Sequence, residues 1–233
     1  MSTTPADTGA SSAGQGAGAF APEQGVGVPL AVGSFGFAVL VLGLANAEVF
    51  TPAAVGIFVP VAMATGALGL LVGGLWEFRA NNIFGGTFAV FYAGFLLTTA
   101  LILRYFSPGI IDSAGDGGFG DAFGAWLLLW GVFTTLLSVG AYHINMPAFL
   151  AFVLLAIPYF LLGFANIIGP GDTADLLTQA GGWTLIIDGI VAWYLSWALA
   201  VNPLIGDRLP LWPYPYSTSE KGVPAGIAPS ATA

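Results

Sequence analysis

Cysteine is absent from the 233 residues of the chain, and histidine occurs once, as His143. Without thiols the chain forms no disulfide, no iron–sulfur cluster and no thiolate zinc site, and it offers no cysteine nucleophile. A single imidazole also excludes haem and metal centres that need two histidine ligands. We therefore expect neither a metal ion nor another cofactor.

Charge is almost as scarce. Only 7% of the residues are charged, as 4 Lys/Arg and 12 Asp/Glu, whereas a soluble domain carries about 25%. So few charges cannot cover a water-facing surface, which excludes a soluble globular fold. The net charge of −8 leaves no basic patch to neutralise phosphates, so nucleic acid is not an expected partner. The composition predicts an integral membrane protein surrounded by the lipid bilayer.

The gaps between charged residues match the length of membrane helices. A helix rises about 1.5 Å per residue and needs about 20 residues to cross the hydrocarbon core. The chain has 24 uncharged residues between Glu23 and Glu48, and 28 between Glu48 and Glu77. Because these apolar runs are continuous and do not alternate, helices are favoured over a β-barrel. The sequence predicts an all-α protein with six transmembrane helices at 29–47, 53–76, 84–104, 122–141, 147–168 and 180–201.

Helix-breaking residues fall between these spans, at 51–52, 107–109, 169–171 and 202–203, where we expect the helices to end. Pro158 lies inside the fifth span, and we expect it to kink that helix and free a carbonyl near Leu154. The predicted organisation is a disordered N-terminal tail at 1–28, a transmembrane domain at 29–205 and a C-terminal tail at 206–233.

The few cations predict an orientation. With six spans, both tails and the loops after the second and fourth helices share one side, which holds Arg79, Arg208 and Lys221. The opposite side holds only Arg104. Because cations collect on the cytoplasmic side, we expect both termini in the cytoplasm and the chain in the plasma membrane.

A short internal repeat links the first and fifth spans. Residues 42–46 read LGLAN and residues 162–166 read LGFAN, 120 positions apart, and each span begins with a proline. Such a parallel repeat occurs in transporters and would place Asn46 and Asn166 opposite each other near one mouth of a central passage. Chance similarity between Leu/Gly/Ala-rich helices is the alternative, in which each asparagine caps its helix.

Few polar residues lie within the predicted spans. Tyr92 lies midway along the third span, where a packing role is the ordinary interpretation. Asp188 is the one acid deep in a span and is a candidate protonatable site. The competing interpretation, which we favour, places Asp188 within about two turns of the membrane face and pairs it with a hydroxyl or amide. Glu77 and Arg79 close the second span and are expected to anchor it at the interface. No nucleophile with a nearby base is visible, so an enzyme is the weaker hypothesis.

Several stretches resemble one family, the acetate uptake transporters (the acetate/succinate permease group). The resemblance covers about residues 29–211, and its strongest segments are PLAVGSF at 29–35, WEFR at 76–79, NIFG at 82–85, LWGVFT at 129–134 and AGGW at 180–183. It implies six spans, a homohexamer, and passage of acetate and similar short monocarboxylates, with succinate as a further candidate, through a pore in each protomer.

The resemblance also implies which residues line that pore. The family's apolar constriction falls on Phe35, Tyr92 and Leu155, and a position linked to substrate size falls on Ala192. A narrow apolar neck flanked by hydroxyl and amide donors suits a small acid with a methyl group. We take Asn46, Asn82 and Asn166 as further candidates for binding substrate or lining the pore.

The chain departs from the family pattern at three positions. Val26 and Gly27 replace the leading asparagine and first proline of the N-terminal signature, and Asp188 stands where the family does not usually carry an acid. An ionised carboxylate in the pore would repel an anion, so we expect Asp188 to face away or to be neutral. Three functions stay open: a passive channel, a proton-coupled symporter, and a membrane scaffold or sensor that no longer conducts.

Overall fold

The computed structural model describes residues 26–51 and 56–212. Most of the predicted N-terminal tail, the break at Pro52 and most of the predicted C-terminal tail fall outside these residues. The described elements are α1 (Val28–Asn46), α2 (Phe58–Pro60), the π-helix η2 (Val61–Ala67), α3 (Leu68–Arg79), α4 (Ile83–Leu101), the π-helix η3 (Ile102–Phe106), α5 (Ser107–Ala141), α6 (Met146–Ile168) and α7 (Asp172–Ile205). Since the described residues form helices and no strand, the all-α prediction is confirmed.

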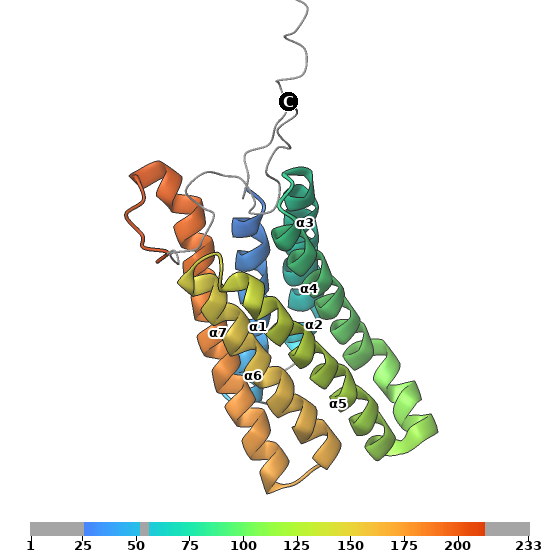
Figure 1. The fold of residues 1–233 in the computed structure, drawn as a ribbon. Coiled ribbons are helices and arrows are strands. Elements are labelled where there is room, and N and C mark those ends of the chain that lie inside the picture. The colour runs from blue at the N-terminus through green and yellow to red at the C-terminus, as the bar shows by residue number, and fades with distance from the viewer. Residues whose placement is uncertain (1–25, 52–55, 213–233) are drawn as a thin grey trace, which may run out of the picture.

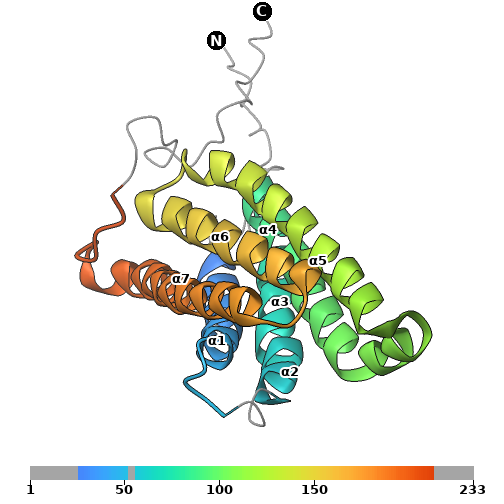
Figure 2. The same cartoon turned by 90° about the horizontal axis from the view of Figure 1, so that it is seen from below.

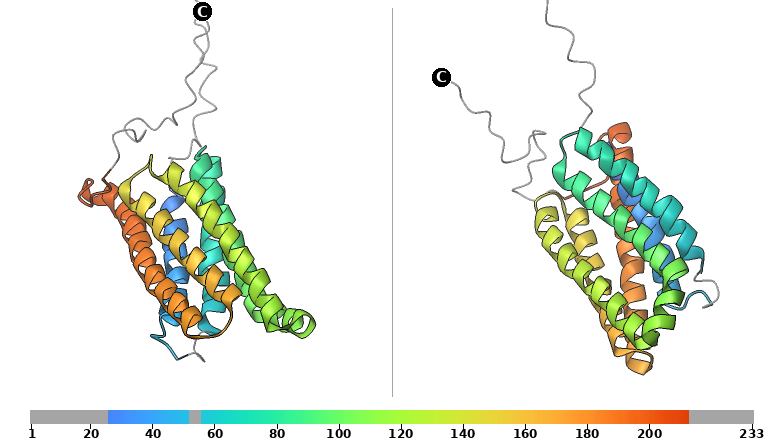
Figure 3. Two further views of the ribbon diagram at one scale, coloured as in Figure 1. Left: turned by 60° about the horizontal axis from the view of Figure 1, so that its bottom comes forward. Right: turned by 90° about the vertical axis from the view of Figure 1, so that its right-hand side faces the viewer.

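Five continuous helical segments of the described chain are long and apolar enough to cross a membrane. The longest is Ile83–Ala141, with 59 residues. It reverses direction at Gly115, whose φ of 74° and ψ of 168° are not helical. Its two arms, α4 and α5, lie side by side (Figure 3), with the Phe95 and Trp130 rings 4.9 Å apart. This segment is therefore a helical hairpin.

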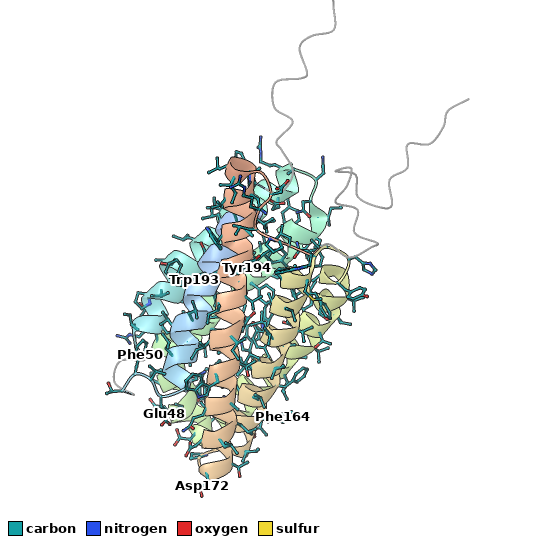
Figure 4. All side chains as sticks on the ribbon, turned by 90° about the vertical axis from the view of Figure 1, so that its left-hand side faces the viewer. Glu48, Phe50, Phe164, Asp172, Trp193 and Tyr194 are labelled. Atoms are coloured by element: carbon teal, nitrogen blue, oxygen red, sulfur yellow. The ribbon has the colours of Figure 1, made fainter. Side chains whose placement is uncertain are left out.

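The helices form one bundle (Figures 1 and 2). Helix α1 packs against α7 and α3, while α6 packs between α5 and α7. The start of α1 and the end of α7 lie at one end of the bundle, here called the Val28 end. Glu48 and Asp172 lie toward the opposite end, here called the Asp172 end (Figure 4). The hydroxyl of Ser196 donates to the Pro29 carbonyl over 2.6 Å, which fastens α7 to α1 near the Val28 end.

Two helices are longer than the sequence predicted. The first arm of the hairpin continues through Pro108 as far as Gly115, and the second arm starts after Gly115 and not at 122. Helix α7 begins at Asp172 and continues through Pro203 to Ile205. The breaks predicted at 107–109 and 202–203 are therefore wrong. The break at 169–171 is confirmed, since α6 ends at Ile168 and α7 starts at Asp172.

The chain folds back onto α7 after that helix ends. The side chain of Asn202 donates to the Leu209 carbonyl over 2.8 Å and accepts the Leu209 N–H over 2.9 Å. Tyr194 donates to the Pro210 carbonyl over 2.6 Å. The first residues of the predicted C-terminal tail are thus bonded to the helix bundle.

Glu77 is a buried carboxylate that joins α1, α3 and α4. Its side chain is 0% exposed. Oε1 accepts the N–H groups of Gly27 and Val28 over 2.7 and 3.0 Å, and Oε2 accepts from Nδ2 of Asn82 over 2.5 Å. A negative group at the start of α1 satisfies free N–H groups and opposes the positive end of the helix dipole. Glu77 is therefore a buried cap at the start of α1; that it also anchors the second span at the interface stays a prediction.

We predict that Glu77→Ala destabilises the bundle strongly. The substitution leaves two buried N–H groups and the Asn82 amide without their acceptor, at a cost of about 3 kcal/mol. For a chain of this size that lowers the unfolding midpoint by about 10 °C, which thermal unfolding in detergent, followed by tryptophan fluorescence, measures. Glu48→Gln, at an exposed glutamate, is the matched control. Equal midpoints for the two variants would contradict the capping role.

Candidate functional site

Two cavities follow one another along the interior of the bundle. The smaller has a volume of about 40 Å³ and lies between α1, α4, α6 and α7. The larger, about 350 Å³, lies on the side of the Asp172 end and includes Asn46, Asn166 and Thr178 in its lining. Leu155 lines both. The cavities therefore meet at the level of Leu155.

The residues implied for the constriction come together at the smaller cavity. Phe35 from α1, Tyr92 from α4 and Leu155 from α6 are all buried and line it. The rings of Phe35 and Tyr92 have centroids 5.7 Å apart. Ala192 of α7 also lines this cavity. We call Phe35, Tyr92 and Leu155 the neck; that substrate passes it remains a prediction.

A buried hydrogen bond positions the tyrosine of the neck. The Tyr92 and Thr134 hydroxyls are 2.7 Å apart, and Thr134 is fully buried on α5. The ring of Tyr92 also contacts Trp130, with centroids 5.6 Å apart. Sequence reasoning missed the role of Thr134, although the residue belongs to the LWGVFT segment at 129–134.

The two asparagines of the internal repeat lie at the larger cavity. Asn46 is the last residue of α1, and Asn166 lies near the end of α6; both line that cavity. Asn166 donates one Nδ2 hydrogen to the Leu162 carbonyl over 2.8 Å, which leaves the second Nδ2 hydrogen available as a donor. The residues that cap these helix ends are Ala47 and Gly169.

Asn82 has a different environment from the other two asparagines. Its Oδ1 accepts the Gly85 N–H over 3.0 Å, as the N-cap of α4, and its Nδ2 binds Glu77. It lines neither of the two cavities. Its side chain is therefore committed to holding helix ends together.

Asp188 lies midway along α7, 16 residues after Asp172, which corresponds to about 24 Å along the helix. Its side chain is 0% exposed, and neither oxygen has a hydrogen-bond partner among the described residues. The pairing with a hydroxyl or amide that we expected is therefore wrong. Leu185 lines the larger cavity and Ala192 the smaller. Because residues three and four apart share a helix face, Asp188 lies between the levels of the two cavities.

Two further buried hydroxyls were missed by sequence reasoning. Thr99 of α4 and Tyr159 of α6 line the larger cavity, and neither hydroxyl has a partner among the described residues. Tyr159 and Tyr92 both interact electrostatically with Asp188. The spacing in the sequence could have identified them. Tyr159 follows Leu155 by one helical turn and Thr99 follows Tyr92 by two, so each shares a helix face with a residue of the neck.

We predict that the Tyr92–Thr134 bond is measurable by a double-mutant cycle. Tyr92→Phe leaves the buried Thr134 hydroxyl unpaired and costs about 1–2 kcal/mol, whereas removing both partners with Thr134→Val costs less than the sum of the single changes. Unfolding midpoints of the four proteins in detergent give the coupling. Strictly additive losses would show that the bond does not stabilise the fold.

The comparisons with known proteins agree on one family. The model of the GPR1/FUN34/yaaH family matches residues 16–205. The chain is 29% identical over 178 residues to the Succinate-acetate/proton symporter SatP of Escherichia coli K12, covering 76% of this chain and 89% of that protein. It is 27% identical over 176 residues to Acetate permease A of Emericella nidulans, covering 71% and 58%.

A third relative and a solved structure complete the comparison. The chain is 35% identical over 173 residues to Ammonia transport outward protein 2 of Saccharomyces cerevisiae, covering 73% of this chain and 59% of the yeast protein. It therefore spans about three-fifths of the length of such fungal relatives. The structure of the bacterial acetate channel SatP matches with a TM-score of 0.71 and 28% identity, over 79% of this chain and 97% of that one. The chain belongs to the GPR1/FUN34/YaaH family, whose members in these comparisons include transporters and a channel, and it is a multi-pass membrane protein.

Proposed function

We propose that the chain conducts acetate and similar short carboxylates, including succinate, across the plasma membrane through a passage inside each protomer. The observation that carries this proposal is the pair of internal cavities that meet at the neck of Phe35, Tyr92 and Leu155. Three similar proteins, an acetate permease, a succinate-acetate/proton symporter and an acetate channel, support the same class of substrate.

The chemistry of the passage suits a small carboxylate. The amides of Asn46 and Asn166 at the larger cavity can replace part of the water around an entering carboxylate. The neck presents two aromatic rings and a leucine, so it favours an ion with a small apolar tail and excludes bulky anions. Ala192, with no side chain beyond Cβ, leaves room beside the neck.

The proposed topology has six crossings, with α4 and α5 counted as two arms of the hairpin at Gly115, and both termini in the cytoplasm.

We also propose a homohexamer. Its support is the outer face of α1 and α7, where Phe37, Trp193 and Trp197 are exposed and suit lipid or a neighbouring copy. Native mass spectrometry of the protein released from detergent should give six copies; a monomer under all conditions would contradict the assembly.

The departure from the family signature at Gly27 has a structural explanation. The Gly27 N–H donates to Glu77, and a proline would have no N–H to donate. A Cβ atom at this position would lie 2.3 Å from the Gly73 carbonyl oxygen, so α1 and α3 approach closely here. Gly27 thus helps to fasten the bundle. This weakens the argument for a non-conducting scaffold, which remains the function to be tested against conduction.

A proton-coupled symporter is the second candidate. Asp188 favours it, because a fully buried acid without a partner between two cavities is costly to leave ionised. Helix α1 carries no titratable side chain, and the titratable groups that line the two cavities on either side of the level of Asp188 are Tyr92 of α4 and Tyr159 of α6. No other acid in the described helices is placed midway along the bundle, so no relay of carboxylates leads from Asp188, and we favour passive conduction.

We predict that Phe35→Ala changes the selectivity of the passage. Purified protein in liposomes should take up radiolabelled acetate down its gradient, and the enlarged neck should raise uptake of butyrate relative to acetate by about tenfold. Phe37→Ala, on the same helix but 50% exposed, is the control and should keep the wild-type ratio. An unchanged ratio in Phe35→Ala would remove the neck from the substrate path, and absence of uptake by every protein would favour the scaffold.

We predict that acetate uptake by the wild type needs no pH gradient, and that Asp188→Asn leaves uptake unchanged at every pH. The amide keeps the size of the side chain but cannot release a proton, so the variant isolates proton transfer. The measurement is acetate flux into liposomes from pH 5 to 8, with and without a pH gradient. Flux that requires the gradient in the wild type and loses that requirement in Asp188→Asn would make the protein a symporter.

A further inference from the structure

Two residues that line the larger cavity carry a buried hydroxyl group that no described residue satisfies. Thr99 is 3% exposed and Tyr159 is 4% exposed, and both residues line this cavity. Neither hydroxyl has a hydrogen-bond partner among the described residues. A buried hydroxyl without a partner costs about 1–3 kcal/mol. A group that enters the cavity and accepts two hydrogen bonds would recover that cost.

The two hydroxyls lie on the inner part of the cavity, between its asparagines and the neck. Tyr159 follows Leu155 by four residues on α6, which is about 6 Å toward the Asp172 end, and Asn166 lies about 10 Å further on. Thr99 follows Tyr92 by seven residues on α4, which is about 10 Å toward the same end. A solute that enters past Asn46 and Asn166 therefore passes the levels of Thr99 and Tyr159 before it reaches Leu155.

The surroundings fix the Tyr159 ring and leave its hydroxyl free. The ring packs edge-on against Phe95, with centroids 5.0 Å apart, and stacks on Trp130 at 6.5 Å. Phe95 precedes Thr99 by one turn on the same face of α4. The buried carboxylate oxygens of Asp188 form no hydrogen bond with Tyr159 or with any other described residue. The Tyr159 hydroxyl is therefore held in place by aromatic contacts, with its donor unused.

We propose that Tyr159 and Thr99 form a carboxylate-binding subsite in the larger cavity, in which both hydroxyls donate to the carboxylate of the conducted acid immediately before it enters the neck. A carboxylate is the acceptor that suits this site, because it takes several hydrogen bonds and its bonds to neutral donors are the stronger, charge-assisted kind. The apolar lining beyond the hydroxyls, with Phe95, Leu96 and Leu155, accommodates the methyl group. The proposal rests on the proposed function and names where the substrate binds.

The test removes each hydroxyl and keeps the shape of the side chain. Tyr159→Phe and Thr99→Val should each raise the KM for radiolabelled acetate uptake by about tenfold, with a smaller change in the maximal rate, because each removes one bond to a charged group. Tyr105→Phe, at a tyrosine 60% exposed, and Thr98→Val, which lines neither cavity, are the matched controls and should keep the wild-type KM. An unchanged KM in Tyr159→Phe and Thr99→Val would mean that the hydroxyls bind water only and would overturn the proposal.

A second readout separates this proposal from conduction itself. Sodium acetate, compared with sodium chloride at equal ionic strength, should raise the unfolding midpoint of the wild type and the controls in detergent, since a ligand that binds only the folded state stabilises it. The rise should be lost in Tyr159→Phe combined with Thr99→Val. If the double variant loses the rise but the wild type takes up no acetate, the subsite would be supported and conduction overturned. Wild-type uptake with an equal rise in the double variant would leave conduction standing and overturn the subsite.

Discussion

Buried polar groups inside this bundle must find their partners within the protein, because the lipid around it offers none. Glu77 meets this constraint fully: its carboxylate accepts three hydrogen bonds and thereby holds the ends of α1, α3 and α4 at fixed positions. The Tyr92–Thr134 bond meets it in the middle of the bundle and orients a ring of the neck. The rest of the architecture, including the alignment of the two cavities, depends on helices held in register by such bonds.

The exceptions to this rule gather in one region. Thr99, Tyr159, Asp188 and the Trp126 indole N–H are buried without hydrogen-bond partners among the described residues. Thr99 and Tyr159 line the larger cavity, and Trp126 stacks on Phe95, which lines it too. The same fold that satisfies Glu77 completely leaves these groups unsatisfied, and two of them belong to residues that line the larger cavity. Unpaired polar groups beside an apolar constriction are what a passage for a small polar solute requires, since the solute supplies the missing bonds while it passes.

Much of this arrangement could be predicted from the sequence, because it follows from patterns of single residues. The spacing of charges located the apolar helices, and the repeat around Asn46 and Asn166 identified two residues that line one cavity. Residues that act through distant partners could not be predicted. Glu77 borders a loop in the sequence, and only packing against the start of α1 buries it. The sequence predicted helix ends at Pro108 and Pro203, but both helical segments continue past the proline. A proline does not always end a helix, because the effect of its missing N–H depends on its position in that helix.

The central claim is that the substrate passes through the interior of each protomer, and locating a bound substrate tests it most directly. Bromoacetate is a suitable probe, since bromine gives an anomalous X-ray signal and the chain has no cysteine for the reagent to alkylate. The account predicts a bromine peak inside the larger cavity, between the neck and the two asparagines. A peak only on the outer surface or between protomers, with none inside the bundle, would contradict it.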